Sequence, residues 1–518
     1  MQLVSSQNNK YDWAPCNLHL LYVLGDVTLD TARCHETERG NLALSRIRMD
    51  IKKSTVKIFV ARVVGFVTSF GGIVFFSRTL GAQQMGVFFL FQAGLNVLSF
   101  AADFGLRGAV EKRMSEGNRM GRVISTGIVI KTVPIVLTSA LILVFRSEIN
   151  EYIGQRVAKF LLVGVAVHEF FQFTVKVLNG ELNVEKTAVI LASRHLVWIS
   201  VGSVFVLQGW GVRGIIIGYL LGYVLMTALG ALRVSTPIRP PTVKQARSLV
   251  RYAKYDAITG GGWRLYSWID VLIIGFVLSQ AAVGAYEIAW KVAGITMLFG
   301  EAIRTTIFPQ ISQWYENGHR KRVESLLSTV LTPSLFFVIP SFFGAISLSE
   351  ELLREVFGPD FAVASGVLIV FMGQKLFQAV DQVYGRTLQA IDRPDLAAYA
   401  TVVGVVANLG LNIVLVLSFG IIGAAFATAL SYGIMAVIRV RFLSHYIQID
   451  LPAQEIAWCT VSSVGMAVVV LGVKSVVVIR GLLPVLELIA LGGAVFVGLW
   501  LLHPICRRDT VRVVANVL

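Results

Sequence analysis

Long runs of hydrophobic residues, separated by short polar segments, extend from residue 57 to residue 502. Each run is close to the length of about 20 residues that a helix needs to cross a bilayer. The runs are continuous, whereas the strands of a membrane β-barrel alternate between polar and apolar positions. A helix satisfies its own backbone in lipid and a lone strand does not. The pattern predicts an all-α integral membrane protein with about fourteen transmembrane helices, at residues 57–78, 84–106, 123–145, 157–178, 186–208, 212–233, 256–279, 282–310, 325–348, 362–387, 395–418, 420–442, 457–478 and 482–502.

The basic residues are concentrated in every second loop. If the segment before the first span is cytoplasmic, the cytoplasmic loops and helix ends hold most of the Lys and Arg residues, as in 107–122, 233–254 and 320–322. The positive-inside rule then places both chain termini in the cytoplasm, which requires an even number of spans. We therefore expect a multi-pass protein of the cell membrane.

The longest segment between two spans, near residues 233–255, divides the chain close to its middle. It contains three prolines, and its cations then alternate with apolar residues, which is typical of a helix lying at the inner membrane surface. The expected domains are an N-terminal extension with little structure (1–48), an N-lobe of helices 1–6 (49–233), a cytoplasmic amphipathic linker (234–255), a C-lobe of helices 7–12 (256–442), and helices 13–14 with a cytoplasmic tail (443–518).

Residues 1–48 have a mixed composition that differs from the rest of the chain. The run Met49 to Lys53 precedes the first span directly, so our hypothesis is that translation starts at Met49 and that residues 1–48 are absent from the mature protein. The pairs Cys16 and His19, and Cys34 and His35, have metal-ligand chemistry. An extension without structure is the simpler interpretation, and we expect no metal site.

The two sets of six helices share three motifs in the same order. Residues 80–88 (LGAQQMGVF) match 278–286 (LSQAAVGAY), and each motif opens the second helix of its half. The other matches pair 171–180 with 381–390 and 211–216 with 420–425. Because each half has an even number of helices, both halves enter the membrane from the same side. Transporters built from such parallel repeats bind their substrate between the halves.

Composition agrees with a membrane protein. The chain has 518 residues, of which 55% are hydrophobic and 15% charged, with a mean hydropathy of +0.70, and soluble proteins are nearer a quarter charged. The loop cations account for the net charge of +15, so nucleic acid is not expected as a partner. Four cysteines give no disulfide framework. We find neither a GxxxxGK[ST] phosphate loop nor an HExxH motif, and we expect no enzyme activity and no cofactor.

At this point a family resemblance is visible. The motif 278–286, the run 302–310 (AIRTTIFPQ), residues 358–361 (GPDF), and Asn408 and Asn412 followed by 419–425 (FGIIGAA) resemble the polysaccharide-export branch of the multidrug/oligosaccharidyl-lipid/polysaccharide (MOP) superfamily, which includes the Wzx flippases. The resemblance covers about residues 50–500. It implies twelve core helices in two lobes, two extra helices, and the flipping of polyprenyl- or dolichyl-linked saccharides. The expected partners are this substrate and membrane lipids, with glycan-assembly enzymes as further candidates.

Charged residues within membrane spans are costly and usually face a cavity or a charged partner. The chain has many of them, and cations are prominent: Arg62, Lys131, His168, Glu169, Arg194, Arg264, Asp270, Glu287, Lys291, Glu301, Arg304, Lys375 and Asp381. A lipid-linked phosphate is anionic and requires cations and hydrogen-bond donors. A basic cavity therefore suits such a cargo better than a cationic drug.

Two polar stripes are expected to line this cavity. His168, Gln172 and Lys176 share one face of a helix, and Gln378, Gln382 and Arg386 repeat the spacing in the other half. As an alternative, Lys176 and Arg386 extend to the membrane surface. The predicted substrate-binding residues are Arg62, Gln172, Lys176, Arg264, Lys291, Lys375, Gln382 and Arg386, and the predicted ion-coupling residues are Asp270, Glu287 and Asp381.

Several of these residues have simpler explanations. Glu287 and Lys291 are four residues apart and are expected to form a local ion pair. Asn408 and Asn412 share a helix face and suit hydrogen bonds between helices. Arg264 follows three glycines that weaken the helix, which suggests a hinge, and an acid on another helix is its alternative partner. The small residues Gly214, Gly218 and Gly222 favour close helix packing.

The leading hypothesis is a flippase that works by alternating access. A multidrug antiporter of the same superfamily is the first alternative, although the first helix has Arg62 and no buried acid. A membrane-bound glycan polymerase or ligase is the second, and the short outer loops and duplicated halves disfavour it.

Overall fold

The computed structural model describes residues 34–117, 119–297, 308–477, 479–504 and 506–507, which form helices and contain no β-strand. The chain forms two compact units, Met1–Lys57 and Ile58–Leu518. In the first unit the backbone is helical from Cys34, and the side chains of residues 34–56 are outside the described part. The hypothesis on Cys16 and His19 therefore lies outside the described residues, and those on Cys34, His35 and Met49 concern residues whose side chains are not described. All contacts below belong to the second unit.

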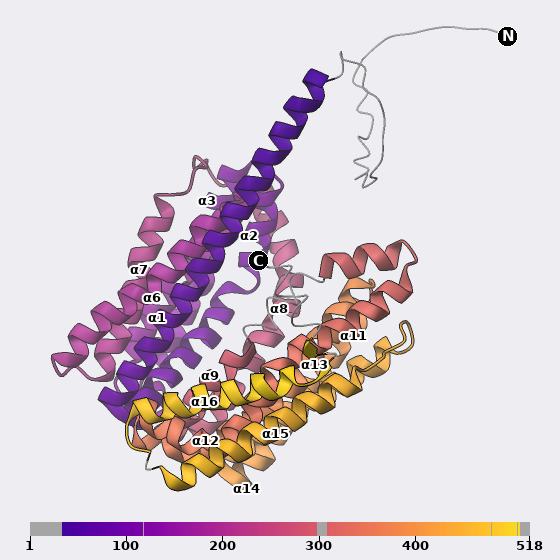
Figure 1. The fold of residues 1–518 in the computed structure, drawn as a ribbon. Coiled ribbons are helices and arrows are strands. Elements are labelled where there is room, and N and C mark those ends of the chain that lie inside the picture. The colour runs from indigo at the N-terminus through magenta and orange to yellow at the C-terminus, as the bar shows by residue number, and fades with distance from the viewer. Residues whose placement is uncertain (1–33, 118, 298–307, 478, 505, 508–518) are drawn as a thin grey trace. The chain divides into compact units, whose positions relative to one another are not determined.

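The first half of the chain forms seven described helices (Figure 1). Helix α1 has a non-helical kink at Gly81, whose φ of 73° lies in the left-handed region that glycine adopts without strain, and the helical segments before and after this kink correspond to the first two predicted spans. The short helices α2 and α4 were not predicted. The bounds are α1 (Cys34–Asp103), α2 (Leu106–Ser115), α3 (Met120–Val144), α4 (Arg146–Ile153), α5 (Ala158–Gly180), α6 (Val184–Leu207) and α7 (Val212–Ala231).

The second half continues in the same way. Helix α14 bends at Gly420 with a φ of 61° and contains two predicted spans. The bounds are α8 (Val243–Val277), α9 (Gln280–Gly294), η1 (Ile295–Met297), α11 (Arg320–Phe336), α12 (Val338–Phe357), η2 (Pro359–Ala364), α13 (Ser365–Ala390), α14 (Pro394–Leu443), α15 (Ala453–Val476) and α16 (Leu482–Leu501).

Each predicted span overlaps a helix in the described part of the structure. Among the described residues, ten helices are long and apolar enough to cross a membrane, and α1 and α14 each contain two of the predicted spans. Of the remaining two spans, one corresponds to α8, whose apolar part is Tyr266–Val277, and the described start of the other, at 282–310, corresponds to α9 and η1. The all-α membrane architecture with about fourteen helices is thereby confirmed.

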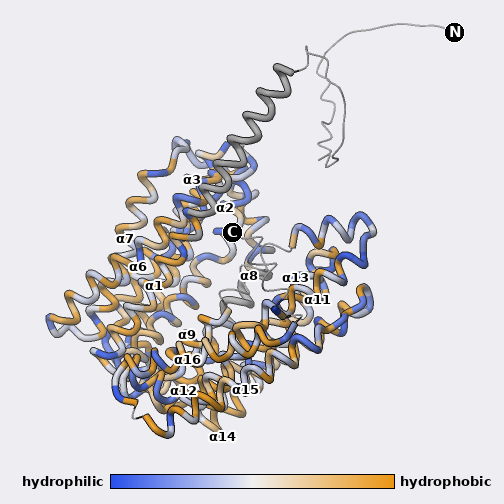
Figure 2. The backbone as a smooth tube through the Cα atoms, viewed as in Figure 1, coloured by the Kyte–Doolittle hydropathy of each residue, from blue (hydrophilic) through white to orange (hydrophobic). Residues whose placement is uncertain are grey.

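The surface of the helices suits lipid. Large apolar side chains such as Val136, Leu417 and Val468 are mostly exposed, although a soluble protein would bury many of them. Hydrophobic residues dominate the middle of the long helices, and hydrophilic residues are more frequent at their ends (Figure 2). This distribution matches a bilayer core bordered by water on both sides.

Helices α6 and α7 pack together more extensively than any other pair of described elements. A Cβ atom at Gly218 would meet the backbone of Gly202 on α6, and one at Gly222 would meet the backbone of Arg194. The predicted close packing along Gly214, Gly218 and Gly222 is confirmed. The two extra helices, α15 and α16, pack on each other and on α12.

The segment between the halves is fixed to the first half by Glu181, in the turn between α5 and α6. Its carboxylate accepts hydrogen bonds from the backbone amides of Ser235 and Thr236 at 3.1 and 2.8 Å and from the Thr236 hydroxyl at 2.6 Å. Burial opposes ionisation of Glu181, but these hydrogen bonds outweigh it and lower the pKa of the carboxyl. Helix α8 then begins at Thr242, whose side chain accepts from the amide of Gln245, and it runs past residue 255 without a break.

Candidate functional site

The two repeated motifs contact each other directly. A Cβ atom at Gly86 would overlap the carbonyl oxygen of Gln280, and a Cβ atom at Gly284 would overlap the carbonyl oxygen of Ala82. In the alignment of 80–88 with 278–286, Gly86 corresponds to Gly284 and Ala82 to Gln280. The contact is therefore reciprocal, as expected across a pseudo-twofold axis, and it brings the two halves together at one end of the helices.

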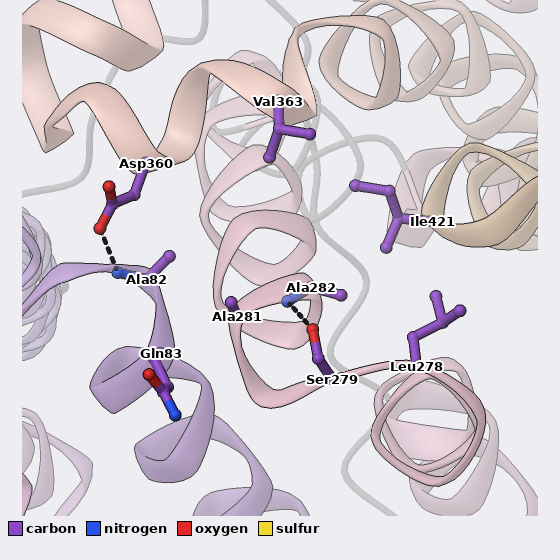
Figure 3. A pocket seen from close by; sticks show the side chains of 9 residues that line it. All are labelled: Ala82, Gln83, Leu278, Ser279, Ala281, Ala282, Asp360, Val363 and Ile421. Atoms are coloured by element: carbon purple, nitrogen blue, oxygen red, sulfur yellow. Dashed lines mark hydrogen bonds between the residues drawn. The ribbon is translucent and has the colours of Figure 1, made fainter.

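Polar contacts reinforce this end. Asp360 in η2 accepts a hydrogen bond from the amide of Ala82 at the α1 bend, at 3.4 Å, at one side of the cavity shown in Figure 3. The hydroxyl of Tyr152 donates to the carbonyl of Leu272 in α8 at 2.7 Å. These contacts hold the two halves together at this end in the described arrangement.

A second cavity, of about 210 Å³, lies between the halves. Its walls come from α1, α6 and α7 of the first half and from α8 and α9 of the second, and they combine aromatic rings with Gln92, Arg194, His195 and Lys291. The Arg194 guanidinium lies over the rings of Tyr219 and Tyr223, 5.4 and 4.7 Å from their centroids. Such cation–π contacts hold the guanidinium without neutralising it.

Arg194 has no acidic partner among the described residues. Its Nη2 atom lies 2.8 Å from Nε2 of His195, and its buried Nη1 atom has no hydrogen-bond partner. An unpartnered buried guanidinium nitrogen is costly. The cavity therefore presents a cation that an anionic group would satisfy. The sequence indicated Arg194 only as one of many charges within spans.

Among the predicted substrate residues whose side chains the structure describes, Lys291 is the one that lines this cavity. Its ammonium lies 3.2 Å from Glu287 and 5.1 Å from the centroid of Phe89, which confirms the local ion pair expected from sequence. Arg62 lines a neighbouring cavity of about 400 Å³. The two cavities share Ser69 and His195, so the basic residues follow one face of α1 and α6.

A cluster of oxygen atoms surrounds Asp270 in α8. Its carboxylate accepts hydrogen bonds from Tyr286 at 2.8 Å, from Asn412 at 2.7 Å and from Thr428. Asn408 donates to Thr428 at 3.3 Å, which confirms that both asparagines bond between helices. The amide oxygens of Asn408 and Asn412 are buried without a donor. Carboxylate, amide and hydroxyl oxygens are the ligands that hard cations prefer.

The first half contains a buried group of charges that compensate one another. The ammonium of Lys131 in α3 lies 3.0 Å from Asp103 and 2.6 Å from Glu169, and Arg107 in α2 pairs with the same two acids. Lys131, Asp103 and Glu169 have fully buried side chains. The sequence did not reveal Asp103, and it placed Arg107 among the cytoplasmic loop cations. That placement is corrected: α2 folds against α5 and buries Arg107.

The predicted polar stripe on α5 binds partners within its own half. His168 is buried with Nδ1 2.9 Å from the Ser99 hydroxyl, and Gln172 lies 3.3 Å from its other nitrogen. Lys176 pairs with Glu111 in α2. Because α5 packs on α2 and α7, this face does not form a wall of the cavity between the halves.

Several side chains of the matching stripe on α13 also have partners. Lys375 is buried, with its ammonium 3.6 Å from the centroid of Trp290 and 2.9 Å from Gln378. Arg386 donates to Gln389 at 2.9 Å, and Gln382 is half-buried. Asp381 pairs with Arg439, which also bonds to Thr401 at 2.7 Å. This ion pair explains Asp381 without an ion-coupling role.

Some predictions fall outside the described residues. The side chain of Arg264 in α8 is one, and Glu301 and Arg304 are others. The role of Arg264 stays a prediction. On α8 and α9, Trp268 lines the cavity between the halves, and Trp290 packs on Lys375.

Comparisons with known proteins agree with this architecture. Residues 75–365 match the family described as polysaccharide biosynthesis protein. The chain is 45% identical to the probable low-salt glycan biosynthesis flippase Agl15 of Haloferax volcanii, over 90% of this chain and 98% of that protein. It is 29% identical to the probable flippase AglR of the same organism, over 76% of this chain and 84% of that protein.

Solved structures share the fold at low sequence identity. The lipid II flippase MurJ in an inward closed conformation aligns with a TM-score of 0.74 and 19% identity, over 88% of this chain and 99% of that chain. A multidrug resistance MATE family transporter of the MOP superfamily, facing inward, aligns with a TM-score of 0.59 and 13% identity, over 75% and 97%. The chain therefore belongs to the polysaccharide biosynthesis protein family and has the fold of the MOP superfamily.

Proposed function

We propose that this protein moves a lipid-linked saccharide across the membrane by alternating access. The observation that carries the proposal is Arg194, a guanidinium with an unpartnered buried nitrogen in a cavity between two repeated halves. The flippase relatives support the same class of cargo. The proposed activity is transport and involves no covalent chemistry, so we do not assign an enzyme reaction.

The cargo phosphate would bind Arg194 and Lys291. A phosphate oxygen accepts the free Nη1 hydrogens of Arg194, and a charge-assisted bond of this kind is stronger than one between neutral groups. The aromatic walls then contact the first sugar, and the apolar lipid tail stays in the bilayer. Arg62 extends the basic surface toward the neighbouring cavity.

The orientation follows from the loop charges. The end closed by Gly86, Gly284 and Asp360 faces outward, both termini are cytoplasmic, and the described arrangement accepts cargo from inside. Glycan-assembly enzymes would supply the cargo at the cytoplasmic face and use it at the outer face. Cargo has to favour one arrangement of the halves over the other for transport to proceed.

A cation at Asp270 would supply the driving force. The amide of Asn412 contacts the carboxylate through its nitrogen, and the oxygens of Asn408 and Asn412 have no donor, so these acceptors together fit a bound Na⁺ better than a proton, because one ion satisfies several acceptors at once. Among the three predicted ion-coupling residues, Asp270 alone has such surroundings, since Glu287 and Asp381 are paired with cations.

The test is to delete the gene and measure lipid-linked saccharides by mass spectrometry on each membrane face. We expect cargo to accumulate at the inner face, with recovery by the wild-type protein and by Arg233→Gln, a change at an exposed cation outside both cavities. Arg194→Gln should fail to restore transport. Accumulation at the outer face would indicate a polymerase or ligase instead, and unchanged saccharides would indicate export of drugs or small solutes.

A further inference from the structure

A polar cavity of about 730 Å³ lies at the predicted outer end, apart from the cavity that holds Arg194. Four turns contribute to it: the bend of α1, the α4–α5 turn, the α6–α7 turn and the start of α9. Its volume is within the range of about 300–1,000 Å³ that small-molecule sites occupy. Nothing in the transport mechanism above uses it.

Glutamine is unusually frequent in this cavity. The side chains of Gln84 and Gln280 connect parts of its lining. The amide oxygen of Gln84 accepts a hydrogen bond from the backbone amide of Val212 at 2.9 Å, and the amide nitrogen of Gln280 donates to the backbone carbonyl of Tyr152 at 3.5 Å. The side chains of Gln83, Gln155 and Gln208 make no hydrogen bond to any described residue, and Gln83 lies on the α1 turn beside Ala82 (Figure 3). Each amide offers two donors and an acceptor.

An aromatic ring and a cation complete the lining. Trp210 is 51% exposed, and its ring packs against Phe205 with a centroid distance of 5.0 Å. A large aromatic side chain supported from behind and open in front offers an apolar face beside polar groups. Arg213 is exposed and forms no ion pair within the described part of the chain.

We propose that this cavity is a second saccharide site, which binds the sugar part of the cargo at the outer face. Sugars present apolar C–H faces and rows of hydroxyls, which match one open ring and three free amides. Arg213 would bind a carboxylate or sulfate on that saccharide. The proposal rests on the proposed function and adds an exit site and an acidic sugar to it. Amides predominate in the cavity over cations, so its chemistry differs from that of a phosphate site.

The position gives the site a role in transport. It lies beside the contact between the halves, and Gln280, from the second half, forms part of its wall. Opening of the outer end separates Gln280 from Gly86 and releases cargo next to the free amides. A saccharide held there would be kept from returning through the opening.

The experiment uses the full-length purified protein. The saccharide is released by mild acid from the host's own lipid-linked pool, labelled with a fluorophore, and titrated by fluorescence anisotropy, while flipping of the intact lipid-linked pool is measured separately in proteoliposomes. We expect Trp210→Ala and the double change Gln155→Ala/Gln208→Ala each to weaken binding at least tenfold. Arg213→Gln should weaken it by a similar factor, and methyl esterification or desulfation of the saccharide should remove that difference. Arg146→Gln, another exposed cation at the same end, should bind as the wild type.

The outcomes separate the two proposals. If the wild type flips cargo but binds no free saccharide, or if Arg194→Gln alone abolishes binding, the exit site is refuted and the flippase stands. If binding depends on Trp210 and Arg213 but no flipping occurs, the transport proposal fails while the saccharide site stands. Size-exclusion profiles confirm folding of each variant. If Trp210→Ala misfolds, Arg213→Gln, a change at an exposed residue, tests the site in its place.

Discussion

Gly86 and Gly284 occupy equivalent positions in the two repeats, and each lies against the backbone of the other repeat. Neither position has room for a Cβ atom, because the carbonyl oxygens of Gln280 and Ala82 occupy that space. A side chain as small as a methyl group therefore acts as a wedge between the halves. The contact between the halves at the predicted outer end depends on two glycines that a substitution can test one at a time.

Gly284→Ala should hold the outer end open. Ala favours a helix over Gly by about 1 kcal/mol, so the change should not unfold α9, but it excludes the close contact with Ala82. We expect transport to fall at least tenfold and a cysteine at Gln280 to become accessible to an impermeant maleimide. Gly294→Ala, in the same helix with no atom near its Cβ, is the control and should transport normally. Normal transport by Gly284→Ala would contradict the model of closure.

Asp270→Asn should abolish the response to sodium. The amide keeps the shape of the carboxylate and its contacts with Tyr286 and Thr428, but it lacks the charge that a cation needs. A ligand at 100 times its Kd stabilises a protein by about 2.7 kcal/mol, so sodium chloride should raise the Tm of the wild type above that in choline chloride. The variant should show no difference. Glu287→Gln should retain the rise in Tm with sodium chloride. If this variant lost that rise, the ion would have to bind at Glu287 instead.

Lys131→Met should destabilise the first half strongly. It leaves Asp103 and Glu169 with Arg107 as the one cation of the group, and a broken buried ion pair costs about 3–5 kcal/mol. The double variant Lys131→Met/Glu169→Gln restores charge balance and should unfold at a higher temperature than the single variant. Additive losses in a thermal unfolding assay would show that the charges are not coupled.

Glu181 should make the linker between the halves sensitive to pH. Its pKa is lowered in the folded protein, so its contribution is complete above the ordinary value of 4.5 and is lost as the pH falls through the lowered folded pKa. At pH 7, Glu181→Gln should speed hydrogen exchange in residues 232–242, while the exposed change Glu148→Gln should not. The difference from wild type should vanish in acid, where the wild-type carboxyl is also neutral.

The sequence predicted the helices well because each span has to be apolar along its whole length. It also predicted the repeated motifs, and one pair of them, 80–88 and 278–286, proved to form a contact between the halves. It could not predict which charges meet, because partners such as Lys131 and Glu169 come from helices whose adjacency no local pattern encodes. Arg107 was misplaced for the same reason: a charge near the end of an apolar run is typical of a loop, and the fold of α2 alone reveals its burial.

Arg194 and the cluster at Asp270 show that prediction of the candidate site from sequence has the same limit. Each residue was visible as a charge within a span, but its meaning depends on what surrounds it. Arg194 became a candidate substrate residue because no acid among the described residues lies beside it. Asp381 became a weaker candidate for ion coupling because Arg439 pairs with it. Such distinctions require the packing of several helices.

The buried charges of the first half have an electrical consequence. Two acids and two cations sum to zero when all four are ionised, so this group moves no net charge when the first half tilts in the membrane field. A transmembrane voltage does work only on displaced charge, about 2.3 kcal/mol per elementary charge per 100 mV. Of this group and the Asp270 cluster, the cluster is the one whose net charge changes when an ion binds, so its contribution to the voltage dependence of transport should follow the occupancy of that carboxylate.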